Sequence, residues 1–203
     1  MKQQNKHTVF FDSSFDNNEQ LPRQFTVSFR ELDNTNIPQV QVFVAGNQQA
    51  GDIIDDNAYE NDGYRYHDVF HYTFATLLGW SPCTRAMLRL KRKSNLQIDK
   101  IEDGARAAIT EEAISLMIFN EAKRKNFFKT AKTRVGKHTL KTIKAMTEPF
   151  EVSIRTMEEW EEAILKAYEM FRLLLQHKGG EIYFNMLQRS VTYRPLPPQE
   201  KFA

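Results

Sequence analysis

The chain has 203 residues, with 28 Lys and Arg, 26 Asp and Glu, and a single cysteine, Cys83. This length suits one domain with a sizeable core, and one cysteine excludes an intramolecular disulfide and a thiolate zinc site. No run of eighteen apolar residues occurs and the opening MKQQNKHTVF lacks the apolar stretch of a secretory signal, so we expect no membrane partner. The single cysteine makes a cytoplasmic setting the expectation.

The first sixty residues show the pattern of strands and turns. Segments 25–31 and 39–46 alternate apolar and polar residues, and the turn-forming segment 33–38 separates them. This arrangement predicts a hairpin or meander, and we assign about 7–60 to an N-terminal β elaboration.

The middle of the chain, 62–146, has the pattern of a helical core. Near-continuous apolar residues stop at Gly79, which indicates a buried helix, and Asp103 is a plausible N-cap for a long one. The expected elements are a buried helix at 64–78, a short basic helix at 84–93, a loop at 94–100, a long helix at about 103–126 and a further helix at 137–146.

The last third of the chain, 149–194, predicts a strand, a helix and a hairpin. Apolar residues at helical spacing mark 157–180 as an amphipathic helix that stops at two glycines. The remaining elements are a strand at the end of 149–156, a closing hairpin of 181–186 and 190–194, and a Pro-rich tail. The predicted fold class is therefore α+β, with a mainly helical bundle core, a small antiparallel β layer from the N- and C-terminal segments, and one domain spanning 1–203.

Positive charge is concentrated in one window. Residues 85–144 carry 16 Lys and Arg but 6 Asp and Glu, and the rest of the chain is acidic. This excess predicts an anionic partner, a nucleotide first and nucleic acid as the less favoured choice; solvated helix faces are the alternative. The cations form two clusters, the first of Arg85, Arg89, Lys91, Arg92 and Lys93, the second of Lys123, Arg124, Lys125, Lys129, Lys132, Arg134, Lys137, Lys141 and Lys144.

The stretch DGYRYHDVFH, 62–71, places three metal-binding or proton-transferring groups at the head of the buried helix. At helical spacing His67 and His71 share one stripe, and Asp68 reaches the same side. The three side chains are therefore expected to face the core.

The helix at 103–126 also carries ionisable groups in an apolar pattern, which Glu111 and Glu112 interrupt. At least one of the two glutamates is expected to be buried. Glu112 is favoured, because apolar residues flank it at helical spacing. An unpartnered buried carboxylate is costly, which predicts that the two helices meet at a Mg²⁺ or Mn²⁺ site whose ligands are Asp68, His71, Glu111 and Glu112. The alternative is a self-satisfied pair, such as His71 with Glu112.

Other catalytic patterns are missing from the sequence. It contains no P-loop, no dinucleotide-binding glycine pattern and no nucleophile elbow. HDxxH is not the zinc-protease motif, which has Glu in the second position. Cys83 follows Pro82 without an activating neighbour in the sequence, which favours a packing role over a nucleophilic one.

Segments 51–95, 101–119 and 150–171 resemble the MazG-like nucleotide pyrophosphohydrolases, and the likeness extends over about 8–194. The resemblance implies the all-α NTP pyrophosphatase superfamily, whose members hydrolyse nucleoside triphosphates to monophosphate and pyrophosphate. They use Mg²⁺ held by acidic residues on two antiparallel helices, and dimers are common among them. The chain departs from their ExxE and ExxD patterns, since it has Asp68-x-x-His71 and Glu112-x-x-Ser115. Both changes reduce the negative charge that would face a metal ion.

The implied mechanism assigns a role to each group. The four acidic and imidazole ligands hold Mg²⁺ against the phosphates, and His67 or Glu111 accepts the proton of the attacking water. The cations expected to bind phosphate are Arg85, Arg89, Lys91, Arg92 and Lys93. A non-catalytic nucleotide- or nucleic-acid-binding module that retains a degenerate metal site is the alternative function.

Overall fold

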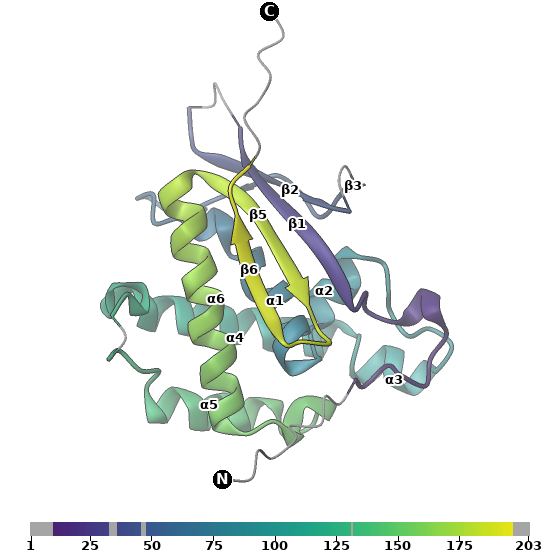
Figure 1. Ribbon diagram of the computed structural model, residues 1–203. Helices are drawn as coiled ribbons and strands as arrows, with labels where there is room; N and C mark the ends of the chain where they lie inside the picture. The colour runs from purple at the N-terminus through teal and green to yellow at the C-terminus, as the bar shows by residue number, and fades with distance from the viewer. Residues whose placement is uncertain (1–9, 33–35, 46–47, 131, 197–203) are drawn as a thin grey trace, which may run out of the picture.

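The structure, a computed structural model, describes residues 10–32, 36–45, 48–130 and 132–196. Its strands form one antiparallel sheet in the order β3-β2-β1-β5-β6, with β4 paired to β2 (Figure 1). The strands are β1 (Gln24–Glu31), β2 (Gln39–Val44), β3 (Gln48–Gln49), β4 (Ile54–Asp55), β5 (Gly179–Asn185) and β6 (Ser190–Arg194). The α-helices are α1 (Asp68–Leu78), α2 (Pro82–Met87), α3 (Leu96–Ile101), α4 (Ala105–Arg124), α5 (Lys137–Thr147) and α6 (Met157–His177). Four 3-10 turns complete the order: η1 (Asn17–Glu19), η2 (Tyr64–Tyr66), η3 (Asn126–Phe128) and η4 (Glu151–Ile154).

Strand β1 lies at the centre of the sheet. It pairs with β2 on one side and with β5 on the other, so the N-terminal strands and the C-terminal hairpin form a single layer. Phe25, Val27 and Phe29, at alternate positions of β1, are buried, as expected for a strand with one face on the core. The predicted α+β class and the antiparallel sheet are confirmed.

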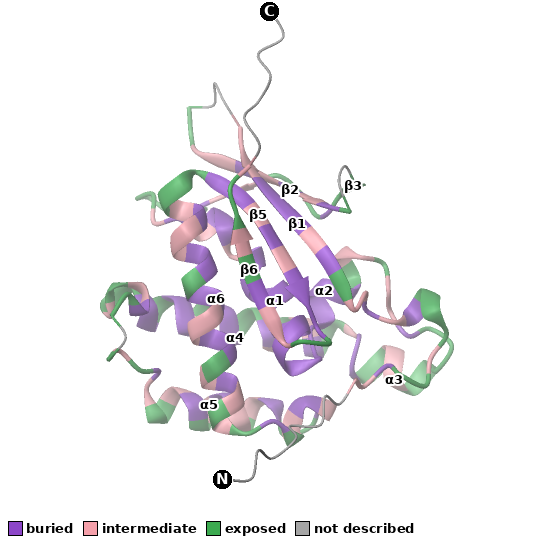
Figure 2. Ribbon diagram, in the orientation of Figure 1, coloured by how far each residue is buried: buried purple, intermediate pink, exposed green. Residues whose placement is uncertain are grey.

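Helix α1 is buried along its whole length, as Figure 2 shows. Tyr72 contacts Phe25 and Phe184 of the sheet, and Phe70 contacts Tyr168 of α6. The core therefore lies where α1 meets both the sheet and α6. The sequence predicted a helical bundle with a small added β layer, but the structure uses the alternating apolar residues of β1, β2 and β5 as one wall of the core.

The helix predicted at 64–78 is divided into the turn η2 and helix α1. Gly63 has a φ of 86°, in the left-handed region, and its N–H donates to Asp56. The same carboxylate accepts the backbone N–H of Arg65 and pairs with its guanidinium at 3.0 Å. This buried anchor fixes the segment that leads into α1, and it thereby fixes the directions of His67 and Asp68.

The region after α1 differs from the prediction in two elements. The helix expected at 84–93 begins earlier, at Pro82 with Ser81 as its N-cap, and it ends at Met87. The loop expected at 94–100 is largely helix α3, which Asn95 caps. Helix α3 has no buried residue, and its apolar side chains Leu96 and Ile101 are exposed, so they do not form the core-facing stripe by which a helix is predicted.

Two further predictions are corrected. Gly104, not Asp103, is the N-cap of α4, since the Asp103 carboxylate accepts instead from the backbone and guanidinium of Arg92. The strand predicted at the end of 149–156 is the 3-10 turn η4, which leads directly into α6.

Helix α6 forms as predicted at its start, where Thr156 and Glu159 make a capping box. It ends at His177, and Lys178 takes the left-handed conformation in the C-cap. Gly179 then opens β5 with a φ of 119°, and a Cβ there would lie 2.4 Å from the carbonyl oxygen of Phe29. The glycine therefore permits the close approach of β5 to β1.

Some predictions fall outside the described residues, namely Gly46 of the second strand, residues 33–35 of the first loop and residues 197–203 of the tail. None of the described helices combines the length and apolar character needed to cross a bilayer.

Candidate metal centre

A cavity of about 530 Å³ lies between the start of α1, helix α2 and one face of α4. Its polar wall consists of Tyr64, Asp68, His71 and Glu112. Its opposite wall is apolar, and the residues that form it include Met87, Ile109, Ala113 and Leu116. The cavity therefore combines ionisable groups with an apolar surface of the kind that ligand sites use.

His71 and Glu111 form the buried floor of this region. The His71 Nδ1 lies 2.9 Å from Oε1 of Glu111, and both side chains are almost completely excluded from solvent. Glu111 also accepts from the hydroxyl of Ser81 at 2.7 Å and from the backbone N–H of Cys83 at 2.9 Å. Since a carboxylate with these donors acts as an acceptor, Nδ1 of His71 carries the proton.

The second ring nitrogen of His71, Nε2, is buried and forms an ion pair with Glu112. It lies 3.3 Å from Oε1 of Glu112, whose side chain is 48% exposed. Burial by itself lowers the pKa of His71, but the charge of Glu111 outweighs it and holds this pKa well above its ordinary value. Burial raises the pKa of Glu112, but the hydrogen bond and charge of His71 outweigh it and lower the pKa to about 2.

His67 is oriented by a backbone carbonyl. Its Nδ1 lies 2.9 Å from the carbonyl oxygen of Tyr64, and its ring stacks on the Tyr64 ring with centroids 4.3 Å apart. A carbonyl only accepts, so Nδ1 carries the proton and Nε2 keeps its lone pair in the neutral imidazole. This Nε2 atom lies 3.4 Å from Oδ1 of Asp68, with which it forms an ion pair when the imidazole is protonated. Burial lowers the pKa of His67 and raises that of Asp68.

These side chains fit a divalent cation. Ligand atoms of His67, His71 and Glu112 lie within 4.8 Å of one another, and Asp68 adjoins them. Each imidazole is fixed through Nδ1, which is how proteins orient a histidine whose Nε2 binds a metal. The alternative drawn from the sequence, a self-satisfied pair of His71 with Glu112, is present in the same geometry, because Nε2 of His71 lies 3.3 Å from Oε1 of Glu112.

A second group, made of His71, Cys83 and Glu111, does not fit a metal equally well. Its carboxylate is already saturated by protein donors. Burial, followed by the charge of Glu111, raises the pKa of Cys83 to about 12, so its thiol stays protonated at neutral pH. This group is a structural connection between helices, and Cys83 lacks the features of a nucleophile.

The structure thus brings together four of the sequence-predicted site residues: His67, Asp68, His71 and Glu112. The prediction that Glu112 is the buried glutamate is wrong, because Glu111 is fully buried and Glu112 is half exposed. The donors that Glu111 receives from α2 were not predicted, although the Ser-Pro pair at residues 81–82 is typical of a helix start.

The cations expected to bind phosphate do not gather at this cavity. Arg85 is buried, with an ion pair to Asp12 at 2.8 Å, and Arg92 is buried, with ion pairs to Asp103 and Glu151 at 2.7 and 2.8 Å. Their guanidinium groups therefore have structural roles. The other three are Arg89, Lys91 and Lys93, and within the described part of the chain no Lys or Arg lines the cavity.

The second basic cluster is partly neutralised within the fold. Lys123 pairs with Asp62 at 2.7 Å and Lys125 with Glu121 at 2.6 Å, while Lys144 donates to backbone carbonyl oxygens. The cluster lies at the end of α4 and along α5, and it does not reach the candidate metal centre.

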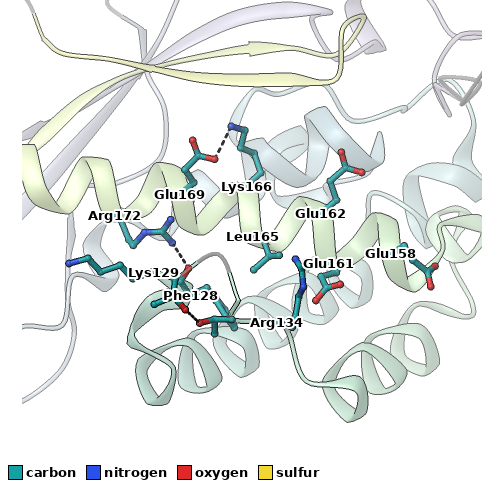
Figure 3. Close-up of a pocket in the computed structure, with 12 residues that line it drawn as sticks. Phe128, Lys129, Arg134, Glu158, Glu161, Glu162, Leu165, Lys166, Glu169 and Arg172 are labelled. Carbon is teal, nitrogen blue, oxygen red and sulfur yellow. Dashed lines mark hydrogen bonds and ion pairs between the residues drawn. The ribbon is translucent and has the colours of Figure 1, made fainter. Parts of the chain in front are cut away.

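Another cavity, of about 600 Å³, lies between α6 and residues 128–134 (Figure 3). Cations such as Lys129 and Arg172 alternate there with acidic side chains of α6 such as Glu169. Arg172 is already bonded to the carbonyl oxygen of Phe127 at 2.6 Å. Because cations and carboxylates are mixed in this lining, the cavity has no electrostatic potential of one sign, and it does not indicate an anion-binding site.

The family model described as MazG C-terminal domain matches residues 6–197. The chain belongs to this family. Comparison with curated proteins and with solved structures gave no match. The MazG C-terminal domain of this chain thus carries, between α1 and α4, a pair of oriented imidazoles and two carboxylates.

Proposed function

We propose that the chain binds a divalent cation in the α1–α4 cavity and hydrolyses nucleoside triphosphates, or related nucleotides, to monophosphate and pyrophosphate. The observation that carries the proposal is the cluster of His67, His71 and Glu112, whose ligand atoms lie within 4.8 Å of one another beside a cavity that Asp68, His71 and Glu112 line. The match to a MazG domain family supports the nucleotide as the class of substrate.

The residues divide into ligands and supporting groups. His67, His71 and Glu112 would hold the cation, with Glu111 as the group that positions His71. When bound, Mg²⁺ or Mn²⁺ polarises phosphate oxygens and makes water more acidic. Glu111, which the sequence suggested as a proton acceptor, is a positioning residue here because protein donors occupy its oxygens.

Asp68 is the group best placed to accept the proton of a water molecule. It lines the cavity, and burial raises the pKa of its carboxyl towards the range that suits a general base. Oδ2 of Asp68 also lies 4.0 Å from the position that a Cβ on Gly51 would occupy, so the chain before β4 closes over this carboxylate.

The apolar wall would receive the rest of the nucleotide. Ile109 and Leu116 are 68% and 50% exposed and border the cavity, so a base could cover them and remove apolar surface from water. The cavity volume of about 530 Å³ is within the usual range for small-ligand sites.

A second candidate is a nucleotide-binding module without turnover. It is favoured by the lack of Lys and Arg among the described residues that line the cavity, because a triphosphate would depend on the metal ion for most of its charge neutralisation.

The test is pyrophosphate release from each NTP and dNTP with Mg²⁺ or Mn²⁺. Asp68→Asn and Glu112→Gln are expected to abolish release, whereas the control Glu148→Gln, an exposed residue after α5, is expected to retain it. Saturable nucleotide binding without product in the wild type would support the non-catalytic module. Release that survives both site substitutions would refute the proposed site.

A further inference from the structure

The two imidazoles of the cluster with Glu112 are oriented alike, although different groups orient them. In His67 the Nδ1 proton is held by the carbonyl oxygen of Tyr64, and in His71 it is held by the carboxylate of Glu111. Both Nε2 atoms therefore face a carboxylate, Asp68 at 3.4 Å for His67 and Glu112 at 3.3 Å for His71, and a bound cation would take the place of these ion pairs. The ring centroids lie 5.7 Å apart, which lets the two nitrogens approach one ion from different sides.

The donor atoms in this cluster decide which metal it suits. Mg²⁺ is a hard cation that prefers six oxygen ligands and keeps several waters, whereas imidazole nitrogen suits first-row transition metals. Here two of the nearest donors are nitrogens, and carboxylate oxygens come from Glu112 and, beside it, Asp68. Histidine carries less negative charge than a carboxylate in the same position. The loss of charge weakens the binding of Mg²⁺ more than the binding of a metal that forms a strong bond to imidazole.

The surroundings of the rings make this arrangement rigid. His71 is 1% exposed, and its partner Glu111 is tied to α2 through Ser81 and the backbone of Cys83. The His67 ring lies flat on Tyr64, with an angle of 4° between the rings. Turning either ring breaks the hydrogen bond of its Nδ1, so both rings are held in place before any ion binds.

We propose that the cluster of His67, His71 and Glu112 selects a divalent first-row transition metal ion over Mg²⁺, with Mn²⁺, the weakest-binding ion of that series, as the probe ion. The inference rests on the proposed function only in placing a cation in this cavity. It goes beyond that function because it names nitrogen ligation by His67 and His71 as the property that sets the metal preference.

The test measures metal binding directly. EDTA-treated full-length protein is titrated calorimetrically with MnCl₂ alone and with MgCl₂ alone, and the Mn²⁺ complex is examined by pulsed electron paramagnetic resonance for coupling to ligand nitrogen. We expect Mn²⁺ to bind with one ion per chain and at least about tenfold more tightly than Mg²⁺, with nitrogen coupling present. Equal or tighter Mg²⁺ binding, or a Mn²⁺ signal without nitrogen coupling, would overturn the inference.

Variants separate ligation from folding. His67→Phe keeps an aromatic ring against Tyr64 but removes the nitrogen donor, and it is expected to lower the Mn²⁺ affinity about tenfold or more while the Mg²⁺ affinity changes less. The matched control is His177→Phe. His177, the last residue of α6, also stacks on a tyrosine, Tyr193, and it lies far along the chain from the residues of the cavity. Thermal unfolding of both variants checks the fold, and unchanged Mn²⁺ binding in a folded His67→Phe would count against the inference.

The result is independent of turnover. Pyrophosphate release is measured on the same samples, so Mn²⁺ preference without release would refute the proposed hydrolysis and leave the metal preference standing. Pyrophosphate release combined with a preference for Mg²⁺ would support the proposed hydrolysis and refute the metal preference.

Discussion

The Nδ1 of His71 lies 2.9 Å from Oε1 of Glu111, and neither side chain reaches solvent to any extent. The same carboxylate accepts from Ser81 and from the backbone of Cys83, at the start of α2. One buried anion therefore joins α1, α2 and α4. This connection holds the imidazole with its Nε2 towards the cavity, so the stability of the fold and the geometry of the site depend on the same contact.

The first prediction concerns this anchor. Glu111→Gln is expected to lower the free energy of unfolding by about 3 kcal/mol, because the amide cannot accept from all the donors that surround the carboxylate. The measurement is urea unfolding in the presence of EDTA. The control is Glu112→Gln, which is expected to change the unfolding free energy by less than about 1 kcal/mol because its side chain is 48% exposed. Similar losses in the two variants would contradict the distinction between a buried anchor and an exposed ligand.

The second prediction concerns the pH dependence of stability through Asp12. Burial raises the pKa of this carboxyl, but the hydrogen bond from Arg23, the N–H of Leu21 and the charge of Arg85 outweigh burial and lower the pKa. Because the folded pKa lies below the unfolded value of about 3.9, the contribution is complete above that value and is lost as the pH falls through the folded pKa.

Asp12→Asn is therefore expected to be less stable than the wild type at pH 7, and the difference should shrink below about pH 4. Urea unfolding between pH 3 and pH 7 measures it. Asp16→Asn serves as the control, since Asp16 is exposed and makes no capping hydrogen bond, and it should follow the wild type. A difference for Asp12→Asn that is constant with pH would show that its charge does not matter.

The third prediction separates the structural from the ligand-binding role of the first basic cluster. Arg92 is 1% exposed and pairs with Asp103 and Glu151, so Arg92→Gln is expected to lower the unfolding free energy by about 3–5 kcal/mol. The folded fraction should still bind nucleotide as the wild type does. Lys93→Gln, at an exposed neighbour, should affect neither property. If the Arg92→Gln variant folds but binds nucleotide much more weakly, the result would contradict the structural role and support the phosphate-binding role that the sequence suggested.

The sequence predicted the elements that have a strong apolar period. The alternation in β1 and the stripe of α6 each place large residues on one face, and the structure buries those faces. Helix α3 was not predicted, because it buries no side chain and therefore has no core-facing apolar stripe; Asn95 caps its start. Gly179 and Gly180 were interpreted as a helix stop, whereas the close contact with Phe29 that makes Gly179 necessary is visible only in three dimensions.

The site was predictable in its residue types but not in its assignments. Helical spacing placed His67, Asp68 and His71 on one side, and the structure brings them together, since His67 lies 3.4 Å from Asp68 and clusters with His71. Periodicity could not decide between Glu111 and Glu112, because the donors that stabilise a buried Glu111 come from α2, a separate segment. In the same way, a run of basic residues does not reveal that Arg85 and Arg92 point inward to partners as distant in sequence as Asp12 and Glu151.

The last prediction concerns the apolar wall of the cavity. Leu116 is 50% exposed and borders the cavity, so Leu116→Ala should cost little stability in the free protein. It is expected to weaken nucleotide binding about fivefold, or ~1 kcal/mol, because part of the leucine becomes buried when the base covers it. Ile154→Ala is the matched control, since Ile154 is 59% exposed on η4 and does not line the cavity. Calorimetric titration with ATP in the presence of Mn²⁺ measures both. If the two variants bind ATP equally well, the base lies elsewhere, and the apolar wall has a role other than receiving the nucleotide.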